Sequence, residues 1–419
     1  MDMHPARARL PTTVLATITL ALSGICGGTE LQALLPEDGI GDSDDGFGYA
    51  MAADNGWVAI GAPGEDDSAG SIYVYACTVA TCTLDDEIQI GALPAGARFG
   101  SAVAISGDRI AVSAPGAGIG EVFVFDRVDD RWEMQQVPGQ VFGSGGRFGV
   151  SLALSGDTLV AGADDQEGRR GVAYVWRWNG GKWAPEQTLR PAERATGDRF
   201  GSAVALNGDT LLVAAPYATA GVAAPGYAAG EVHAYTRSGS TWTRTQVLRA
   251  LFPLTRSRFG VSLGLDGDTA VVGEPGAAFG AGRVYLFTRQ LGSFSLQSVL
   301  MPADIEADDA FGWSVALRGD RLVVAAPFAG IALDACGRIE RYQREGGVFV
   351  SQGPLRLPGA TPDGLFGWTV ALGNVGEFAS TPASVGRAGL GHYFNAAESV
   401  FDDAFEIPLG PCFAPKPVR

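Results

Sequence analysis

Residues 98–115 read RFGSAVAISGDRIAVSAP, and the prediction of the fold starts from this stretch. A Phe-Gly pair opens it, an alternating apolar run follows, a Ser-Gly-Asp turn interrupts the run, and a second apolar run ends in Ala-Pro. Alternation of apolar and polar residues predicts β-strands that are buried on one face. Glycine supplies the positive φ that a tight hairpin needs, and proline ends a strand because it cannot donate a hydrogen bond to the ladder. The stretch therefore predicts a pair of antiparallel strands.

Copies of this stretch recur along the chain, each opening with a Phe-Gly pair, at spacings of 52, 49, 52, 59, 52 and 55 residues. Such a period indicates a repeat architecture. Each copy divides into four short strands, which we expect at residues 100–105, 109–114, 121–125 and 132–137 in the second copy. One four-stranded sheet cannot bury both of its faces, whereas seven sheets set radially cover one another. We therefore predict an all-β, seven-bladed β-propeller of four-stranded antiparallel blades over residues 29–396. The seven pairs begin at Phe47, Phe99, Phe148, Phe200, Phe259, Phe311 and Phe366.

The seventh copy has no evident fourth strand after Asn395. Residues 30–36, which precede the first Phe-Gly pair, match the fourth strands of other copies, such as residues 246–250. We expect this N-terminal strand to close the ring by pairing with the last blade, because it would cover an edge that otherwise invites aggregation. The alternative is that residues 405–409 form an ordinary fourth strand.

The composition supports a large β-protein and excludes several classes of partner. Glycine accounts for 60 of the 419 residues, and 46% of the chain is hydrophobic, so global disorder is excluded. Acidic residues outnumber basic ones by 46 to 30, giving a net charge of −16. A protein that binds nucleic acid needs clustered Lys and Arg, and the sequence has no such cluster. We therefore expect no nucleic-acid partner.

Residues 1–28 are similar to a secretory signal sequence. Arg7 and Arg9 give the charged start, and residues 10–22 form the apolar core. The core is short for a membrane span, and no later stretch reaches about 18 apolar residues. We expect a secreted, periplasmic or cell-surface protein without a membrane span. The alternatives are an uncleaved N-terminal anchor and a lipid attached to Cys26.

The repeat unit has a Phe-Gly pair at its start and a Gly-Ala-Pro sequence some fifteen residues later, complete at residues 61–63 and nearly so at 113–115 and 214–216. This pattern resembles the FG-GAP repeat of integrin α-subunit propellers, and more closely its short bacterial variant, over residues 30–396. The resemblance implies a binding or adhesion module. Many integrin-type repeats carry a calcium loop between strands one and two. Here a tight turn such as Asn-Gly-Asp at 207–209 stands there, too short to supply six to eight oxygen ligands, so no calcium is expected at that site.

Four acidic clusters fall in predicted loops, and none has the spacing of a complete calcium loop. We interpret them as solvated loops. The weak candidates for calcium or magnesium are Asp66, Asp67, Asp164 and Asp165, and no cofactor is expected. The four clusters lie at residues 42–45, 65–67, 164–165 and 308–309.

No catalytic residue is predicted, because the chain has no nucleophile elbow, zinc-binding helix motif or phosphate loop. His233 and His392 fall in third strands at the register of Tyr73 and Tyr285, where each is expected to replace a packed aromatic ring. Tryptophans recur in fourth strands, and we favour structural packing there over a stacking platform for sugars. These are Trp132, Trp183 and Trp242.

Five cysteines in an exported chain favour disulfides. Cys77 and Cys82 flank a four-residue loop between strands three and four, where a bridge is predicted. Cys336 is predicted to pair with Cys412 and so tie the tail, residues 397–419, to the ring.

We therefore predict an exported, monomeric, non-catalytic module that presents loops to a protein or glycan. The expected contact loops are residues 218–229 and 328–336, because loops on rigid scaffolds usually carry function. The alternatives are a polysaccharide-acting hydrolase or lyase with its site at the mouth of the ring, and a structural envelope protein. Three or more carboxylates or basic groups converging at one mouth of the ring would favour an enzyme, and a flat, neutral or apolar face would favour a binding module.

Overall fold

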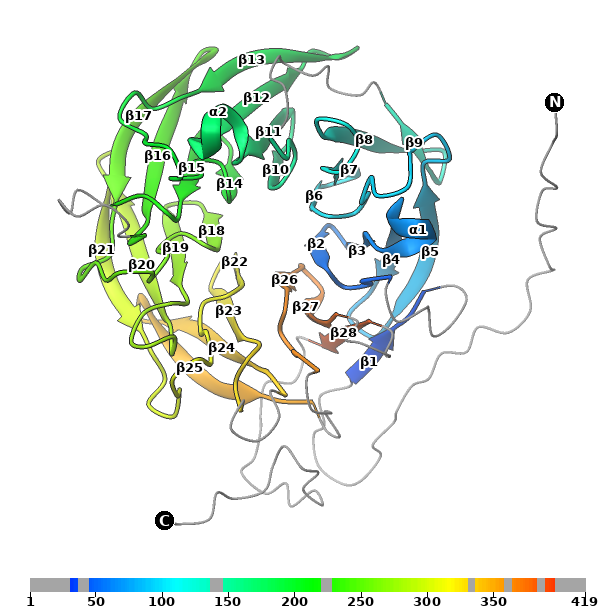
Figure 1. The fold of residues 1–419 in the computed structure, drawn as a ribbon. Coiled ribbons are helices and arrows are strands. Elements are labelled where there is room, and N and C mark those ends of the chain that lie inside the picture. Colours follow the sequence, from blue (N-terminus) through cyan, green and yellow to red (C-terminus); the bar gives the residue numbers. More distant parts are fainter. Residues whose placement is uncertain are drawn as a thin grey trace, which may run out of the picture.

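The computed structural model describes residues 31–36, 45–135, 146–219, 228–330, 336–357, 364–382 and 389–395. These residues form seven four-stranded antiparallel sheets set around one axis (Figure 1). The chain runs outward through the strands of each sheet, so that the first strand of every blade lies nearest the axis. The predicted seven-bladed β-propeller is therefore confirmed.

Blades are numbered here by their Phe-Gly pairs. The strands of blades 1 to 3 are β2 (Ala50–Asp54), β3 (Trp57–Ala62), β4 (Ser71–Cys77) and β5 (Cys82–Gln89); β6 (Val103–Ser106), β7 (Arg109–Ala114), β8 (Glu121–Val128) and β9 (Arg131–Met134); and β10 (Leu152–Ser155), β11 (Thr158–Ala163), β12 (Val172–Trp178) and β13 (Trp183–Leu189). Those of blades 4 to 6 are β14 (Val204–Asn207), β15 (Thr210–Ala215), β16 (Glu231–Ser238) and β17 (Thr241–Leu248); β18 (Leu263–Asp266), β19 (Thr269–Glu274), β20 (Arg283–Gln290) and β21 (Ser293–Leu300); and β22 (Val315–Arg318), β23 (Arg321–Ala326), β24 (Arg338–Glu345) and β25 (Val348–Leu355). Blade 7 contains β26 (Val370–Leu372), β27 (Gly376–Thr381), β28 (Leu390–Asn395) and β1 (Leu31–Leu34). Two short helices, α1 (Glu65–Ser68) and α2 (Gln166–Arg169), follow the second strands of blades 1 and 3.

The first strands begin later than the sequence pattern predicts. In blade 2 we expected a strand from residue 100, but β6 starts at Val103. The reason is that the Phe-Gly pair lies inside a turn, in which the Ser101 amide donates to the Arg98 carbonyl (3.2 Å). The hairpin that follows is as predicted, since Ser106 faces Arg109 across a tight turn with Gly107 at φ +59°.

The seven phenylalanines of the Phe-Gly pairs form the centre of the interblade core, and each is at most 4% exposed. Phe99, for example, packs among Ile72 and Val74 of blade 1 and Val112 of blade 2. Burial of a Phe side chain contributes about 1.5–3 kcal/mol. The repeated Phe is therefore what holds neighbouring sheets together.

Glycine allows adjacent blades to touch through their backbones. A Cβ on Gly61, the first residue of the Gly-Ala-Pro sequence, would lie 2.0 Å from the carbonyl oxygen of Gly100 in the next blade. A Cβ on Gly171, which precedes a third strand, would lie 1.9 Å from the carbonyl oxygen of Phe200. A side chain at either glycine would collide with the neighbouring blade. The Gly-Ala-Pro sequence of one blade therefore meets the Phe-Gly pair of the next blade at their boundary.

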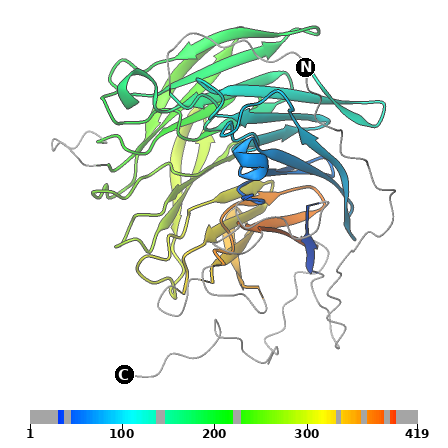
Figure 2. The same cartoon turned by 45° about the vertical axis from the view of Figure 1, so that its right-hand side comes forward.

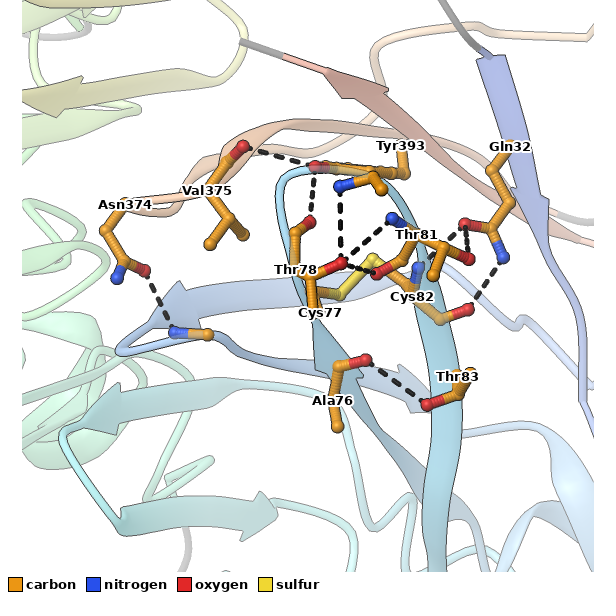
Figure 3. Close-up of a disulfide and its surroundings, with 12 residues drawn as sticks. Gln32, Ala76, Cys77, Thr78, Thr81, Cys82, Thr83, Asn374, Val375 and Tyr393 are labelled. Atoms are coloured by element: carbon orange, nitrogen blue, oxygen red, sulfur yellow. Dashed lines mark hydrogen bonds between the residues drawn. A yellow bond between two sulfur atoms is a disulfide. The ribbon is translucent and has the colours of Figure 1, made fainter. Parts of the chain in front are cut away.

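The ring closes through the N-terminal strand, as predicted. β1 pairs antiparallel with β28, with Gln32 opposite Tyr393, and the blue strand lies beside the red one in both views (Figures 1 and 2). The hydroxyl of Tyr393 also donates to the Thr78 carbonyl of blade 1 (2.7 Å; Figure 3). The alternative closing segment, residues 405–409, lies outside the described residues.

The predictions of a signal sequence and of a disulfide to Cys412, and the alternative of a lipid on Cys26, concern residues that the structure does not describe. Residues 1–28, Cys26, Cys412 and the tail at 397–419 all lie outside the described residues. Within the part that the structure describes, no helix has the length and apolar character needed to cross a membrane.

Candidate functional site

Seven equivalent turns surround the axis where the chain enters the innermost strands. Each turn runs from the residue before Phe to the residue after Gly and is closed by a hydrogen bond of 3.0 to 3.3 Å between those two residues. The residue before Phe has a left-handed φ of 51° to 66° in all seven blades. The first and fourth side chains of each turn are therefore neighbours at the entrance to the ring. The turns begin at Gly46, Arg98, Arg147, Arg199, Arg258, Ala310 and Leu365.

The side chains at these turns divide the entrance into two arcs. In blades 2 to 5 the first position is always arginine, and in blades 6, 7 and 1 the fourth position is always aromatic. We call Arg98, Arg147, Arg199 and Arg258 the arginine arc. The aromatic arc comprises Trp313, Trp368 and Tyr49, together with Phe328 from the loop after β23. The two arcs together are called the mouth ring.

The aromatic arc is a continuous row of ring contacts. The ring centroids are 5.3 Å apart between Phe328 and Trp313, 5.0 Å between Trp313 and Trp368, and 6.4 Å between Trp368 and Tyr49. All four side chains are partly exposed, and Tyr49 reaches 37%. The row therefore presents aromatic surface to solvent across three blades.

Asp164 organises one half of the arginine arc. It replaces the proline of the Gly-Ala-Pro sequence in blade 3, and its side chain is 3% exposed. One carboxylate oxygen contacts Arg147 at 2.5 Å and Arg199 at 3.4 Å, and it also accepts from the Ser202 hydroxyl at 3.2 Å. The expected solvated loop is therefore wrong at Asp164, because this weak cation candidate is buried and its carboxylate contacts two guanidinium groups.

Arg98 and Arg258 form the other half of the arginine arc, and both are exposed. The Arg98 guanidinium lies 5.7 Å from the centroid of the Tyr49 ring. Arg258 and Arg199 both lie over Tyr217, at 5.5 and 5.2 Å. Among the described residues, neither Arg98 nor Arg258 has a carboxylate partner, so an anion from solution can reach them.

The other acidic candidates do not come together. Asp66 and Asp67 sit at the exposed tip of α1 with left-handed φ of 48° and 55°, and Asp165 pairs with Arg169 at 3.2 Å in blade 3. Asp309 is buried, accepts a backbone amide in its own turn, and burial raises its pKa. Over the described ranges, no group of three or more His, Cys, Asp or Glu side chains could hold a metal ion. Asp42 and Asp44 lie outside them.

The two histidines replace packed aromatic rings, as predicted. His233 meets Phe200 edge-on with centroids 5.2 Å apart, and His392 meets Phe366 at 5.7 Å. Burial lowers the pKa of each to about 4. The equivalent position in blade 6 is Glu340, which is buried against Arg338 and whose pKa is raised by burial.

The fourth-strand tryptophans are structural, which confirms the preferred interpretation. Trp132, Trp183 and Trp242 are at most 7% exposed. An arginine lies over each of them: Arg127 over Trp132 and Arg237 over Trp242, both from third strands, and Arg109 of the second strand β7 over Trp183.

The predicted Cys77–Cys82 disulfide is present at the hairpin that faces β1 (Figure 3). Cys336 is also disulfide-bonded, while its predicted partner Cys412 lies outside the described residues.

The mouth ring was missed in the sequence analysis, although its signal is in the sequence. The signal lies in the residues on either side of the Phe-Gly pairs. The pattern is Arg-Phe-Gly followed by Ser or Val in four consecutive copies, and Phe-Gly followed by Trp or Tyr in the other three. The expected contact loop at 328–336 contributes Phe328, whereas residues 220–227 of the other expected loop lie outside the described residues.

Comparison with known proteins agrees with the repeat architecture. A family model described as FG-GAP repeat matches residues 29–75, 94–125, 183–235, 242–287 and 294–337, which together make up more than half of the chain. A search of curated proteins gives no significant match. With its Phe-Gly and Gly-Ala-Pro sequences meeting at the blade boundaries of a seven-bladed ring, the chain belongs to the FG-GAP repeat family.

Proposed function

We propose that this protein is a binding or adhesion module whose ligand contacts the mouth ring. The observation that carries the proposal is the division of the entrance into an exposed aromatic row and a row of arginines. Trp, Tyr and Arg are the side chains that most often dominate binding energy at interfaces. Because they stand on seven backbone-closed turns, they are held in place before a ligand arrives, which reduces the entropy lost on binding.

We also propose that the module acts without catalysis. The Asp164 carboxylate beside the arginine arc contacts Arg147 and Arg199, so it is poorly placed to accept a proton from a substrate. His233 and His392 are buried against phenylalanines. A general acid or base must come within hydrogen-bonding distance of the proton it transfers, and neither histidine is exposed enough to do so.

Export is part of the same proposal. It is supported by the charged and apolar segments within residues 1–28 and by the Cys77–Cys82 disulfide. Disulfides persist mainly in secreted, periplasmic and cell-surface proteins.

A second candidate is a polysaccharide lyase, which the converging basic groups favour. Elimination beside a uronate carboxylate requires cations that stabilise the developing negative charge. Arg199 and Arg258 flank Tyr217 in that manner, with its hydroxyl as the group that would carry a proton. Incubation with polyuronates separates the candidates: a lyase generates unsaturated ends that absorb ultraviolet light, whereas a binding module leaves the polymer intact.

The proposed function is tested by screening the purified full chain against glycan and protein arrays, with and without calcium. The affinity of each ligand that binds is then measured for Trp368→Ala and for Leu291→Ala as the control, because Leu291 is fully exposed in the turn between β20 and β21, at the other end of the strands from the mouth ring. The expected result is a loss of at least about tenfold in affinity for Trp368→Ala and no change for the control. Ligands that bind both variants as tightly as the wild type would overturn the proposal.

A further inference from the structure

We infer that the ligand of the mouth ring is an acidic glycan, a polymer of sugar rings that carry carboxylates or sulfates. This inference rests on the proposed function and specifies its ligand class. In the proposed complex, the aromatic arc packs against the faces of sugar rings, while Arg98 and Arg258 hold the anionic groups.

The charge of the mouth ring has the sign that an acidic ligand requires. The arginine arc brings four guanidinium groups to the entrance, and two of them, those of Arg147 and Arg199, contact the Asp164 carboxylate, although the chain as a whole has a net charge of −16. A guanidinium group binds a carboxylate or sulfate through two parallel hydrogen bonds, which adds direction as well as energy. Each of the two exposed guanidinium groups lies over an aromatic ring, Arg98 over Tyr49 at 5.7 Å and Arg258 over Tyr217 at 5.5 Å from the ring centroid.

The aromatic arc supplies the apolar half of the site. Its rings follow one another at centroid distances of 5.0 to 6.4 Å, and they remain partly exposed. Sugar rings are flat bodies with an apolar C–H face and a polar rim, so a row of aromatic rings can pack one sugar after another. Arg98 is next to the aromatic arc, because its guanidinium group lies over Tyr49, the last ring of that arc.

The backbone of the mouth ring favours a glycan over an acidic peptide. An extended peptide is usually captured by adding a strand to an open sheet edge through backbone hydrogen bonds. Here the amide that follows each Phe-Gly pair is already bonded within its own turn, as Tyr49 is to Gly46 and Trp313 to Ala310. The site therefore offers side chains rather than a backbone ladder.

The experiment measures binding of the purified full chain to polygalacturonate, alginate and carrageenan, to methyl-esterified polygalacturonate, and to poly-glutamate. The variants are Arg98→Gln, Arg258→Gln and Tyr49→Ala, with Arg131→Gln as the control because Arg131 is exposed on a fourth strand. We expect an acidic glycan to bind, and each arginine variant to lose about tenfold or more in affinity while the control keeps it. Added salt should weaken the interaction, since exposed charges are screened.

Three outcomes would overturn the inference. If the methyl ester binds as tightly as the acid and Tyr49→Ala still weakens binding, the acidic glycan is wrong while the binding module stands. If poly-glutamate binds through the two arginines and no glycan does, the ligand is an acidic peptide. If none of the probes responds to any mouth-ring variant, neither the ligand class nor its site is supported. Circular dichroism spectra matching the wild type show that the variants are folded.

Discussion

The side-chain amide of Gln32 in β1 holds the backbone of Cys82 in β5 through two hydrogen bonds (Figure 3). Its Nε2 donates to the Cys82 carbonyl at 2.7 Å, and its Oε1 accepts from the Cys82 amide at 2.8 Å. The boundary between the last and first blades is therefore built like an internal boundary, although its strand comes from the start of the chain. The same pair of bonds joins Gln187 to Trp242 and Gln246 to Phe294.

Removing this closure should destabilise the whole ring. Gln32→Ala leaves both backbone groups of the buried Cys82 without these partners, and we expect it to lower the free energy of unfolding by about 2 kcal/mol. Gln297→Ala is the control, because Gln297 is an exposed fourth-strand residue that bonds only within its own strand. Chemical denaturation measures both. Deletion of residues 29–36 should lower the melting temperature further, and an unchanged melting temperature would show that β1 does not close the ring.

Phe259 tests the interblade core. Its ring is completely buried and meets Tyr285 edge-on with centroids 5.2 Å apart. Phe259→Ala leaves a cavity, and we expect a loss of about 3–5 kcal/mol in the free energy of unfolding. Phe279→Ala, at a residue that is 93% exposed, should change it by less than about 0.5 kcal/mol. Similar losses for the two variants would contradict the assignment of Phe259 to the core.

Glycine at the blade boundary can be tested with a matched pair. Gly171 has φ +80°, and a Cβ there would lie 1.9 Å from the Phe200 carbonyl oxygen, so Gly171→Ala must force two blades apart. We expect a loss of about 3 kcal/mol or more. Gly156 also has a positive φ, +53°, but faces open space, so Gly156→Ala should lose about 1 kcal/mol. Equal effects in thermal denaturation would mean that backbone strain, and not interblade contact, determines the loss at Gly171.

His392 should make stability depend on pH. Burial lowers its pKa from the ordinary 6.5 to about 4, so the unfolded chain binds a proton more readily than the folded one. The stability that neutral His392 gives to the folded state is fully present above pH 6.5. As the pH falls from 6.5 towards 4, the free energy of unfolding should decrease by about 3 kcal/mol in total.

The variant His392→Phe isolates this effect, because Phe123 occupies the equivalent position in blade 2. The difference in unfolding free energy between the variant and the wild type should grow as the pH is lowered through this window. A difference that stays constant between pH 6.5 and pH 4 would show that the two states of His392 titrate alike.

The amino-acid sequence alone was enough to predict the number of blades, the positions of their hairpins, the N-terminal closure and the Cys77–Cys82 bridge. These features could be predicted because they depend on local sequence patterns that recur in each copy. Phe-Gly pairs, glycine turns and alternating strands form the same structure wherever they occur in the repeat. The interpretation of His233 and His392 succeeded for the same reason, since their register was visible in the repeat.

The side chains that meet at the entrance to the ring could be identified only in the folded protein. Trp313 and Trp368 are separated by a whole blade in sequence, yet their rings lie 5.0 Å apart. In the sequence, Asp164 looks like a carboxylate in a loop. In the folded protein it contacts Arg147 and Arg199, because the radial packing of the blades brings the turns of blades 3 and 4 to the position where other blades have the proline of Gly-Ala-Pro. A repeat fixes each blade locally, but closing the ring sets residues about fifty positions apart side by side, and the mouth ring is made by that closure.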